Sequence, residues 1–229
     1  MNFANLFRIA LKALSNNKFR GFLTMLGIII GVGSVITMLA IGQGSKKSIQ
    51  AEISEMGSNM IMISPGAERR GGVRMSGDDM QTLKVKDFED ILSKCKYITL
   101  ASPTVNASGQ AVYGANNTPT SVQGVTQDYL DIRGYKVKDG DIFSDQDIHT
   151  SAKVCVIGKT VVDELFPDGE SPVGKVIRFG SIPFRIVGVL ESKGTNSMGQ
   201  DQDNLMFAPY TTVMKRIQAV TYLQGITCS

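Results

Sequence analysis

Residues 21–45 carry no Lys, Arg, Asp or Glu, and this gap in charge constrains the chain more than any other feature. Leu, Ile, Val and Met dominate residues 21–42, which as an α-helix would span roughly 30 Å, the thickness of a bilayer hydrocarbon core. A second uncharged run, residues 97–127, is rich in Ser, Thr, Asn, Gln and Pro and cannot cross a membrane. The first run therefore predicts a transmembrane helix over residues 21–45; a buried helix of a soluble core is the alternative.

The charges are divided by this stretch into two unlike groups. Four basic residues and no acidic residue precede it, whereas residues 46–229 hold 20 Lys and Arg against 21 Asp and Glu, so the net charge of +3 is the sum of +4 and −1. The larger part has no basic excess to meet phosphates, which argues against nucleic acid as a partner. The mean hydropathy of +0.02 excludes a protein with many spans, and the apolar content excludes a disordered chain.

A cleaved signal peptide is the other explanation of an apolar N-terminal stretch. Its apolar region would run for only ~7–15 residues and end at small residues. The stretch here is longer, and residues 41–46 make a poor cleavage site, so we expect an uncleaved anchor. The positive-inside rule then places the N-terminus in the cytoplasm and residues 46–229 outside.

Before the span, residues 1–20 are expected to form a cytoplasmic amphipathic helix. Arg8 and Lys12 lie on a different face from the apolar side chains, and Lys18 and Arg20 follow just before the span. Such a helix suits the inner membrane surface, with its cations toward lipid phosphates, and it equally suits a protein partner. The apolar residues recur at helical spacing: Phe3, Leu6, Phe7, Ala10, Leu11 and Leu14.

Inside the span, small residues recur at three- and four-residue spacing. Thr24, Gly27, Gly31 and Ser34 share one face, and the two glycines form a G-x-x-x-G pair. Small residues allow two helix backbones to approach closely in lipid. We therefore expect a contact with a neighbouring span through this face, although the motif is common by chance in glycine-rich spans.

The exported part, residues 46–229, is expected to form an α+β domain. The membrane helix should continue outward over residues 45–56, followed by a short strand at 59–64, a mobile loop at 67–77 and a helix at 85–94. Strands outnumber helices beyond this point without βαβ alternation, which favours α+β over a doubly wound sheet. Strands are predicted at 98–105, 109–115, 118–125, 153–157, 174–180, 182–190 and 204–208, helices at 126–132, 158–165 and 210–217, and an exposed loop at 192–204.

Catalytic, cofactor-binding and metal sites find little support, so we assign no residue to any of them. Gly158-Lys159-Thr160 resembles the end of a phosphate-binding loop, but the glycine required five positions before Gly158 is Lys153. His149 is the only histidine, which leaves a catalytic triad or a zinc site almost without candidates. The acidic turn formed by Asp139, Asp141, Asp145 and Asp147 lacks the order of an EF-hand, and a solvated turn is the simpler interpretation.

Three cysteines, Cys95, Cys155 and Cys228, are widely spaced along the chain. Cys155 lies in an apolar strand and is expected to be a buried thiol. The alternative for Cys95 or Cys228 is to form a disulfide outside the cell, where disulfides persist.

Several motifs in the same order resemble MacB-like ABC transporter permeases, of the MacB and FtsX type. Residues 17–32 look like the first membrane helix of that family, and the resemblance spans nearly the whole chain. It continues through the motifs at 41–44, 56–59, 124–126, 156–158, 172–175 and 187–190.

The resemblance implies a permease subunit that transmits motion rather than forming a channel. It implies a separate ABC ATPase subunit that hydrolyses ATP, so the chain itself would be no enzyme and would bind no cofactor. Further implied partners are the membrane, a second permease copy or a paralogue, and in the exporters a periplasmic adaptor and an outer-membrane channel. Relatives release lipoproteins or switch on cell-wall hydrolases.

Two departures from the family pattern shape the expectation. No ATPase domain precedes Met1, and the three further spans of the family are missing, so we expect residues 46–229 to be a periplasmic core domain cut short at its C-terminal end. The leading hypothesis is the N-terminal half of such a permease. The alternative is a single-span, membrane-anchored extracytoplasmic binding or sensor module, and an exported enzyme is a third reading with few residues to support it.

Overall fold

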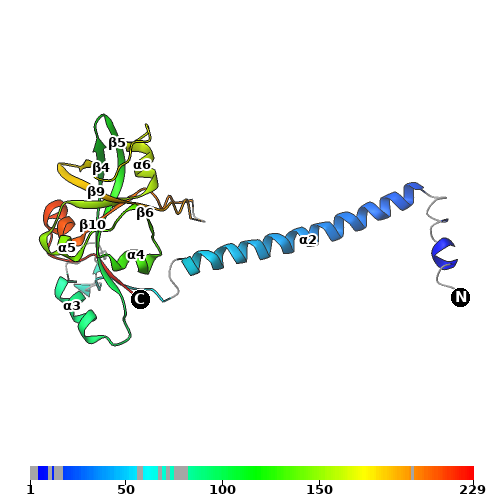
Figure 1. Cartoon of the computed structure of the whole chain (residues 1–229). Helices are drawn as coiled ribbons and strands as arrows, with labels where there is room; N and C mark the ends of the chain where they lie inside the picture. The colour runs from blue at the N-terminus through cyan, green and yellow to red at the C-terminus, as the bar shows by residue number, and fades with distance from the viewer. Residues whose placement is uncertain are drawn as a thin grey trace. The chain divides into compact units, whose positions relative to one another are not determined.

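The computed structural model describes residues 5–9, 12, 18–55, 59–66, 69–70, 73–74, 82–196 and 199–229, and divides the chain into two units (Figure 1). The first unit is Met1–Ala51 and the second is Glu52–Ser229. Each is described separately below.

One helix, α2 (Lys18–Glu55), dominates the first unit. It contains no proline, so its backbone ladder is uninterrupted. Its 38 residues correspond to a length of about 57 Å at the α-helical rise. The predicted helix over residues 21–45 is therefore part of a longer one, which begins before Arg20 and continues outward as expected. No described side chain of α2 is buried.

The second unit is an α+β domain, as predicted, built around strands that close into a ring. The hairpin of β4 (Ala101–Tyr113) and β5 (Asn116–Val125) turns at Gly114, whose φ of +58° suits glycine. From β5 the ring runs to β10 (Leu205–Pro209), β7 (Val154–Ile157), β9 (Ile182–Leu190) and β8 (Val176–Phe179), and β8 pairs again with β4. The β5–β10 and β7–β9 pairs are parallel and the other pairs of the ring are antiparallel. Because the ring is closed, each of these six strands pairs with a neighbour on both sides, and none is a free edge.

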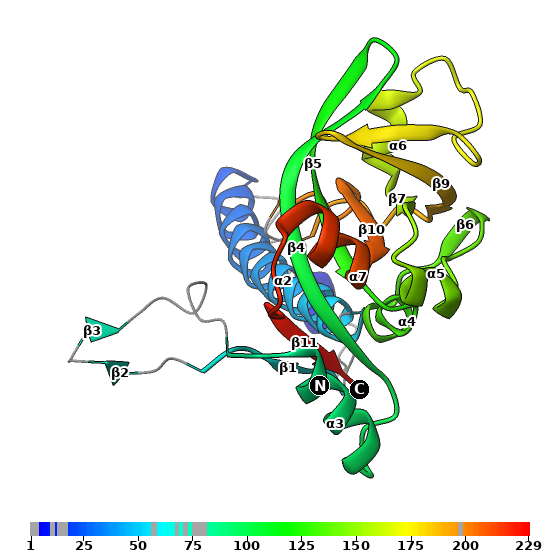
Figure 2. The ribbon, with the colours of Figure 1, turned by 90° about the vertical axis from the view of Figure 1, so that its left-hand side faces the viewer.

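A smaller three-stranded extension is joined to the first half of β4. There β11 (Gly225–Cys228) pairs antiparallel with β4, and β1 (Ile61–Ile63) pairs antiparallel with β11 (Figure 2). Strands β1 and β4 are therefore parallel, with β11 between them, and α3 (Val85–Lys94) lies between them in the sequence. This is a split βαβ unit.

The remaining elements decorate the ring. Strand β6 (Val137–Gly140) pairs with β9, and the ribbon of β2 (Arg69–Arg70) and β3 (Val73–Arg74) lies between β1 and α3 in the sequence. The helices are α4 (Asp128–Arg133), α5 (Asp145–Thr150), α6 (Lys159–Leu165) and α7 (Tyr210–Thr212), and the last continues as the π-helical segment η2 (Val213–Gln218).

Two apolar clusters hold the domain together. The larger one includes Phe184, Ile177 and Leu165, all fully buried, and reaches Phe88 on α3. The smaller one surrounds Phe207, whose ring meets those of two tyrosines edge to face. Aromatic groups bury large apolar areas, so these clusters supply much of the stability of the domain.

Several predicted elements are corrected by the structure. The separate strands predicted at 98–105 and 109–115 are one strand, β4, because its pairing with β5 runs without a break from Val105 to Tyr113. The prediction of an acidic turn is wrong in part. Asp139 lies in β6, and Asp145 and Asp147 lie in the first turn of α5, which Ser144 caps. The sequence analysis missed β6, α5 and β11. In the loop predicted at 67–77, residues 69–70 and 73–74 form the ribbon and the others lie outside the described residues.

The loop predicted at 192–204 is ordered around one buried carboxylate, that of Asp203. Its oxygens accept hydrogen bonds from the Ser192 hydroxyl, from the Lys193 amide at 2.8 Å and from the Gly194 amide at 3.0 Å. The same residue presses its carbonyl against Gly158, where an added Cβ would lie 2.1 Å from that oxygen. The loop is therefore fixed to the start of α6.

We predict that Asp203→Ala destabilises the domain by about 2–3 kcal/mol, because it removes a buried carboxylate that accepts hydrogen bonds from two half-buried amides and a hydroxyl. Chemical unfolding of the full chain in detergent, followed by fluorescence of the tyrosines, would measure the loss. The control is Asp168→Ala at an exposed position, which should change the free energy of unfolding by less than about 0.5 kcal/mol. Equal stability of the two variants would contradict the assigned role.

Candidate functional site

The predicted cytoplasmic cations all lie on helical backbone where the structure describes them. Arg8 belongs to a short helical stretch, residues 5–9, and Lys12 is also helical. Lys18 and Arg20 belong to the first turn of α2 and are exposed. Of the predicted apolar face, Leu6 and Phe7 are exposed, whereas Phe3, Ala10, Leu11 and Leu14 lie outside the described residues.

The small residues of the span share one face of α2. At about 100° per residue, Thr24, Gly27, Gly31 and Ser34 fall within an arc of about 80°. A Cβ added at Gly27 or Gly31 would meet nothing within 4 Å. This face is open along the described helix, and larger side chains there would not disturb the helix itself.

The hydroxyl groups on this face are satisfied by the helix that carries them. Thr24 donates to the Arg20 carbonyl, and Ser34 donates to the Gly31 carbonyl at 2.9 Å. Thr37, elsewhere on the helix, donates to the Gly33 carbonyl at 2.8 Å. These internal bonds remove the cost of placing a hydroxyl in hydrocarbon, so the polar residues are compatible with a span.

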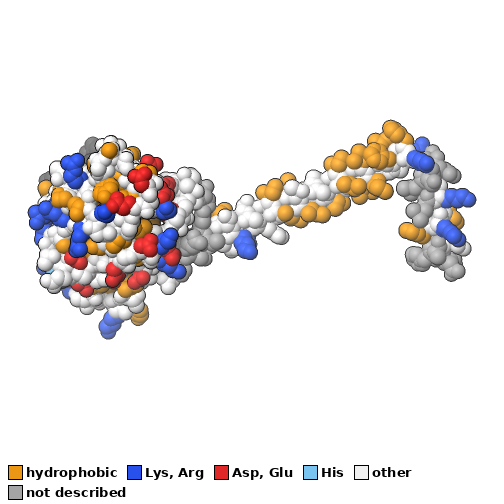
Figure 3. Space-filling model, turned by 45° about the horizontal axis from the view of Figure 1, so that its top comes forward, with side chains coloured by type: hydrophobic (Ala, Val, Ile, Leu, Met, Phe, Trp, Pro, Cys, Tyr) orange, Lys and Arg blue, Asp and Glu red, His pale blue; other side chains and the backbone are white. Residues whose placement is uncertain are grey.

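The rest of α2 presents large apolar side chains. Ile28, Ile36 and Met38 are among those that are more than half exposed. Figure 3 shows apolar side chains along the helix. Acidic and basic side chains are interspersed on the visible face of the second unit (Glu52–Ser229), called the exported unit below. By length and composition, residues 18–50 can cross a membrane.

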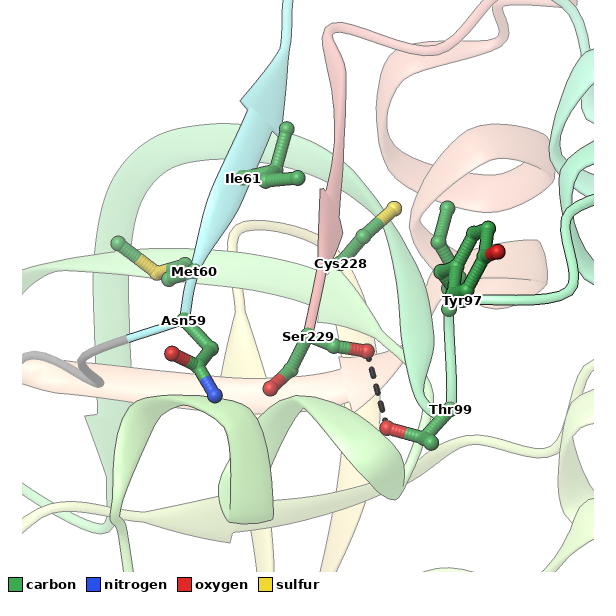
Figure 4. Close-up of a pocket in the computed structure, with 8 residues that line it drawn as sticks. Asn59, Met60, Ile61, Tyr97, Thr99, Cys228 and Ser229 are labelled. Carbon is green, nitrogen blue, oxygen red and sulfur yellow. Dashed lines mark hydrogen bonds between the residues drawn. The ribbon is translucent and has the colours of Figure 1, made fainter.

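A cavity of about 550 Å³ lies at the three-stranded extension of the exported unit (Figure 4). Asn59, Met60 and Ile61 line it from the start of β1, and Tyr97, Ile98, Thr99, Cys228 and Ser229 line the other side. Tyr97 is 98% exposed and Met62, the next residue of β1, is 65% exposed. The cavity was not predicted; the alternation of Met and Ile in residues 60–63 is the only sequence signal for it.

Residues that resembled catalytic or binding motifs have structural roles. The Gly158 amide donates to the Leu205 carbonyl at 2.9 Å, so it is not available to a phosphate, and Lys159 pairs with Asp163. His149 is exposed on α5. Among the described residues, no group of three His, Cys, Asp or Glu side chains could hold a metal ion.

Burial controls the reactivity of the thiols. Cys155 is fully buried in β7, as predicted, and burial raises its thiol pKa far above the ordinary value. Cys228 is buried in β11 and Cys95 is exposed at the end of α3. All three are free thiols in the structure.

Comparison with known proteins identifies relatives along nearly the whole chain. The model of the MacB-like periplasmic core domain family matches residues 22–227. A protein of Syntrophobacter fumaroxidans named "Macrolide export ATP-binding/permease protein MacB" is 42% identical over 91% of this chain, and one of the same name from Pectobacterium atrosepticum is 38% identical over 98%. The chain spans 29% and 34% of their lengths, about a third.

Two solved structures are similar in fold to the exported unit. The periplasmic region of MacB from Actinobacillus actinomycetemcomitans matches 77% of this chain and 77% of its own, with a TM-score of 0.64 and 29% identity. The extracellular domain of the transporter YknZ from Gram-positive bacteria matches 75% of this chain and 83% of its own, with a TM-score of 0.59 at 19% identity, and therefore shows the fold alone.

We predict that Val32→Arg, in the middle of the uncharged stretch, disfavours membrane insertion of α2 by about 2.5–3.5 kcal/mol. A glycosylation-based insertion assay on the intact chain measures this change. The matched control is Ile49→Arg, because Ile49 is also exposed on α2 but follows Lys46 and Lys47. Insertion that is equally efficient in both variants would contradict the assignment of α2 as a span.

Proposed function

Because the chain belongs to the family of MacB-like periplasmic core domains, we propose that it acts as a permease subunit of an ATP-driven export system. A separate ATPase subunit hydrolyses ATP in the cytoplasm, and α2 carries the resulting motion to the exported unit. The relatives named above are export proteins with ATP-binding and permease functions, which supports this reading.

The continuity of α2 is the single observation that carries the proposal. The helix is about 57 Å long, against a hydrocarbon core of about 30 Å, so it extends well beyond the bilayer. In the sequence, five residues (56–60) lie between its end and β1, and 56–58 are outside the described residues. A proline-free helix is stiff, and a short connection transfers axial displacement better than a long flexible linker would.

The exported unit is suited to move as one body. Its closed ring of strands shares the apolar cluster that also holds α3, so a displacement applied near β1 reaches the whole domain through packed side chains. Asp203 fixes the longest loop to the same framework. Substrate or a periplasmic adaptor would be engaged by the surface of this unit.

Two sets of residues in the first unit fit two further kinds of partner. Arg8, Lys12, Lys18 and Arg20 form a basic cytoplasmic end that meets the ATPase subunit and anionic lipid. The face formed by Thr24, Gly27, Gly31 and Ser34 contacts a neighbouring span, either in a second copy or in a paralogue. The N-terminus lies in the cytoplasm in this arrangement, because the basic excess precedes the span.

A membrane-anchored binding module is the second candidate, and the cavity beside Tyr97 favours it. Such a module would need no ATPase. The presence or absence of a bound ATP-hydrolysing subunit therefore distinguishes the two functions.

We predict that the protein, isolated from its native cells in mild detergent, brings an ABC ATPase subunit with it. Arg8→Glu combined with Lys12→Glu should reduce the recovered ATPase severalfold, because it reverses the charge of the cytoplasmic end. Quantitative mass spectrometry of the purified complex measures this recovery.

The matched control for this experiment is Lys136→Glu combined with Lys138→Glu, which reverses two exposed charges of the exported unit. It should leave recovery unchanged. Repeated recovery of no ATPase by the unsubstituted protein would reject the transporter function and favour the anchored module.

We also predict that Gly27→Leu combined with Gly31→Leu weakens association between spans by about tenfold, because it separates the two backbones. Energy transfer between labelled copies in bilayers measures self-association, and the same assay with a paralogue covers a mixed pair. The control is Gly33→Leu, on a different face of α2, where an added Cβ also meets nothing within 4 Å. An equal effect at Gly33 would show that the small-residue face has no special role.

A further inference from the structure

The structure brings two of the three cysteines to one place in the exported unit. Cys95 ends α3, where its amide donates to the Ile91 carbonyl at 3.1 Å. Cys228 lies in β11, the strand next to the start of β4. They are distant in sequence, yet both belong to the three-stranded extension and the helix beside it.

Backbone hydrogen bonds fix this proximity. The amides of Thr99 and Leu100 both donate to the Ser229 carbonyl, at 2.9 and 3.2 Å, and the Ser229 amide donates to the Leu100 carbonyl at 2.9 Å. The Thr99 hydroxyl donates to the same Ser229 carbonyl at 3.0 Å. Only residues 96–98 thus separate Cys95 from backbone bonded to the residue after Cys228.

The side chain of Cys228 faces the right way. It is buried in the same apolar cluster as Phe88 of α3, with Ile91 and Ile98 packed against that cluster. Figure 4 shows its sulfur directed from β11 toward the segment that carries Tyr97, two residues after Cys95. Cys228 also lines the cavity of about 550 Å³.

The two thiols differ in reactivity in a way that suits sequential attack. Cys95 is exposed, whereas burial, and then the neighbouring Cys95, raise the pKa of Cys228. An exposed thiol reacts first with an external disulfide, and a buried thiol with a raised pKa reacts later, once a partner sulfur is held beside it and its proton has been lost. Cys155 is buried in β7 and takes no part.

We propose that Cys95 and Cys228 form a thiol–disulfide switch that links the end of α3 to β11. In the first step the Cys95 thiolate attacks an external disulfide, either protein-borne or of low molecular weight, forming a mixed disulfide and releasing one thiolate. In the second step Cys228 loses its proton and attacks the Cys95 sulfur, which expels the second thiolate. Two thiols of the protein are oxidised, and the one external disulfide is reduced to two thiols.

The switch would stiffen the part of the domain that follows α2 in the sequence. Strand β1 pairs with β11, so a link from β11 to α3 holds the whole split βαβ unit together. In the cell, this switch rests on the proposed function, which places the domain in the periplasm, since disulfides persist there and are rare in the cytosol.

The test uses the purified full chain in detergent, incubated with oxidised glutathione. We expect the loss of two of the three thiols, an intact mass lower by two hydrogen atoms, and a proteolytic peptide pair joined through Cys95 and Cys228. Cys155→Ala should behave in the same way. Cys228→Ala should stop at a glutathione adduct on Cys95, and Cys95→Ala should form no internal link.

A stable glutathione adduct on Cys95 in the unsubstituted protein, linkage of two copies through Cys95, or no reaction would each overturn the proposal. Thermal unfolding provides a second measurement: the oxidised chain should unfold at a higher temperature than the reduced chain, and Cys95→Ala, at an exposed position, should abolish the difference. The reaction needs no ATPase, so its failure would leave the proposed function standing.

Discussion

A peptide group in hydrocarbon has no water with which to form hydrogen bonds, so an apolar segment in a membrane must satisfy every N–H and C=O within its own helix. Residues 21–45 meet this demand as part of α2, and the hydroxyls of Thr24 and Ser34 meet it too by donating to carbonyls of the preceding turn. In the proposed arrangement, the basic residues before this helix and the folded unit after it lie on opposite sides of a membrane.

The exported unit meets a different demand, because its strands must avoid free edges in water. The ring from β4 through β5, β10, β7, β9 and β8 does so by closing on itself. At the extension the described part of the sheet stops at β1, where Met62 is largely exposed. The cavity lies at this same extension, and so do Cys95 and Cys228, so the proposed switch would act there.

The sequence alone predicted the long apolar helix, the α+β class and most of the strands of the ring, because apolar runs bounded by Gly, Pro and Asn mark them clearly. It did not predict that residues 101–113 form one strand, since the small and polar residues 106–109 are held in β4 by pairing with β5 rather than by their own propensity. Strand β6 and helix α5 were missed because their acidic residues are typical of turns.

The candidate site was predictable only where local spacing decides it. The face that holds Gly27 and Gly31 follows from helical periodicity, whereas the cavity and the Cys95–Cys228 pair depend on contacts between distant segments, such as the bonds from Thr99 and Leu100 to Ser229. The role of Asp203 was hidden for the same reason, since three of its donors lie about ten residues earlier in a loop with no periodicity.

Transmission of motion through α2 is tested most directly by measuring the height of the exported unit above the membrane. A fluorophore at Val176→Cys, an exposed position, with Cys95→Ala to remove the other exposed thiol, would transfer energy to acceptors in the lipid headgroups. In the complex with the ATPase, the account predicts that this distance changes between ATP-bound and nucleotide-free states, and that Ser48→Pro, which breaks α2, abolishes the change while Ser48→Ala preserves it. An unchanged distance in both nucleotide states would contradict the account.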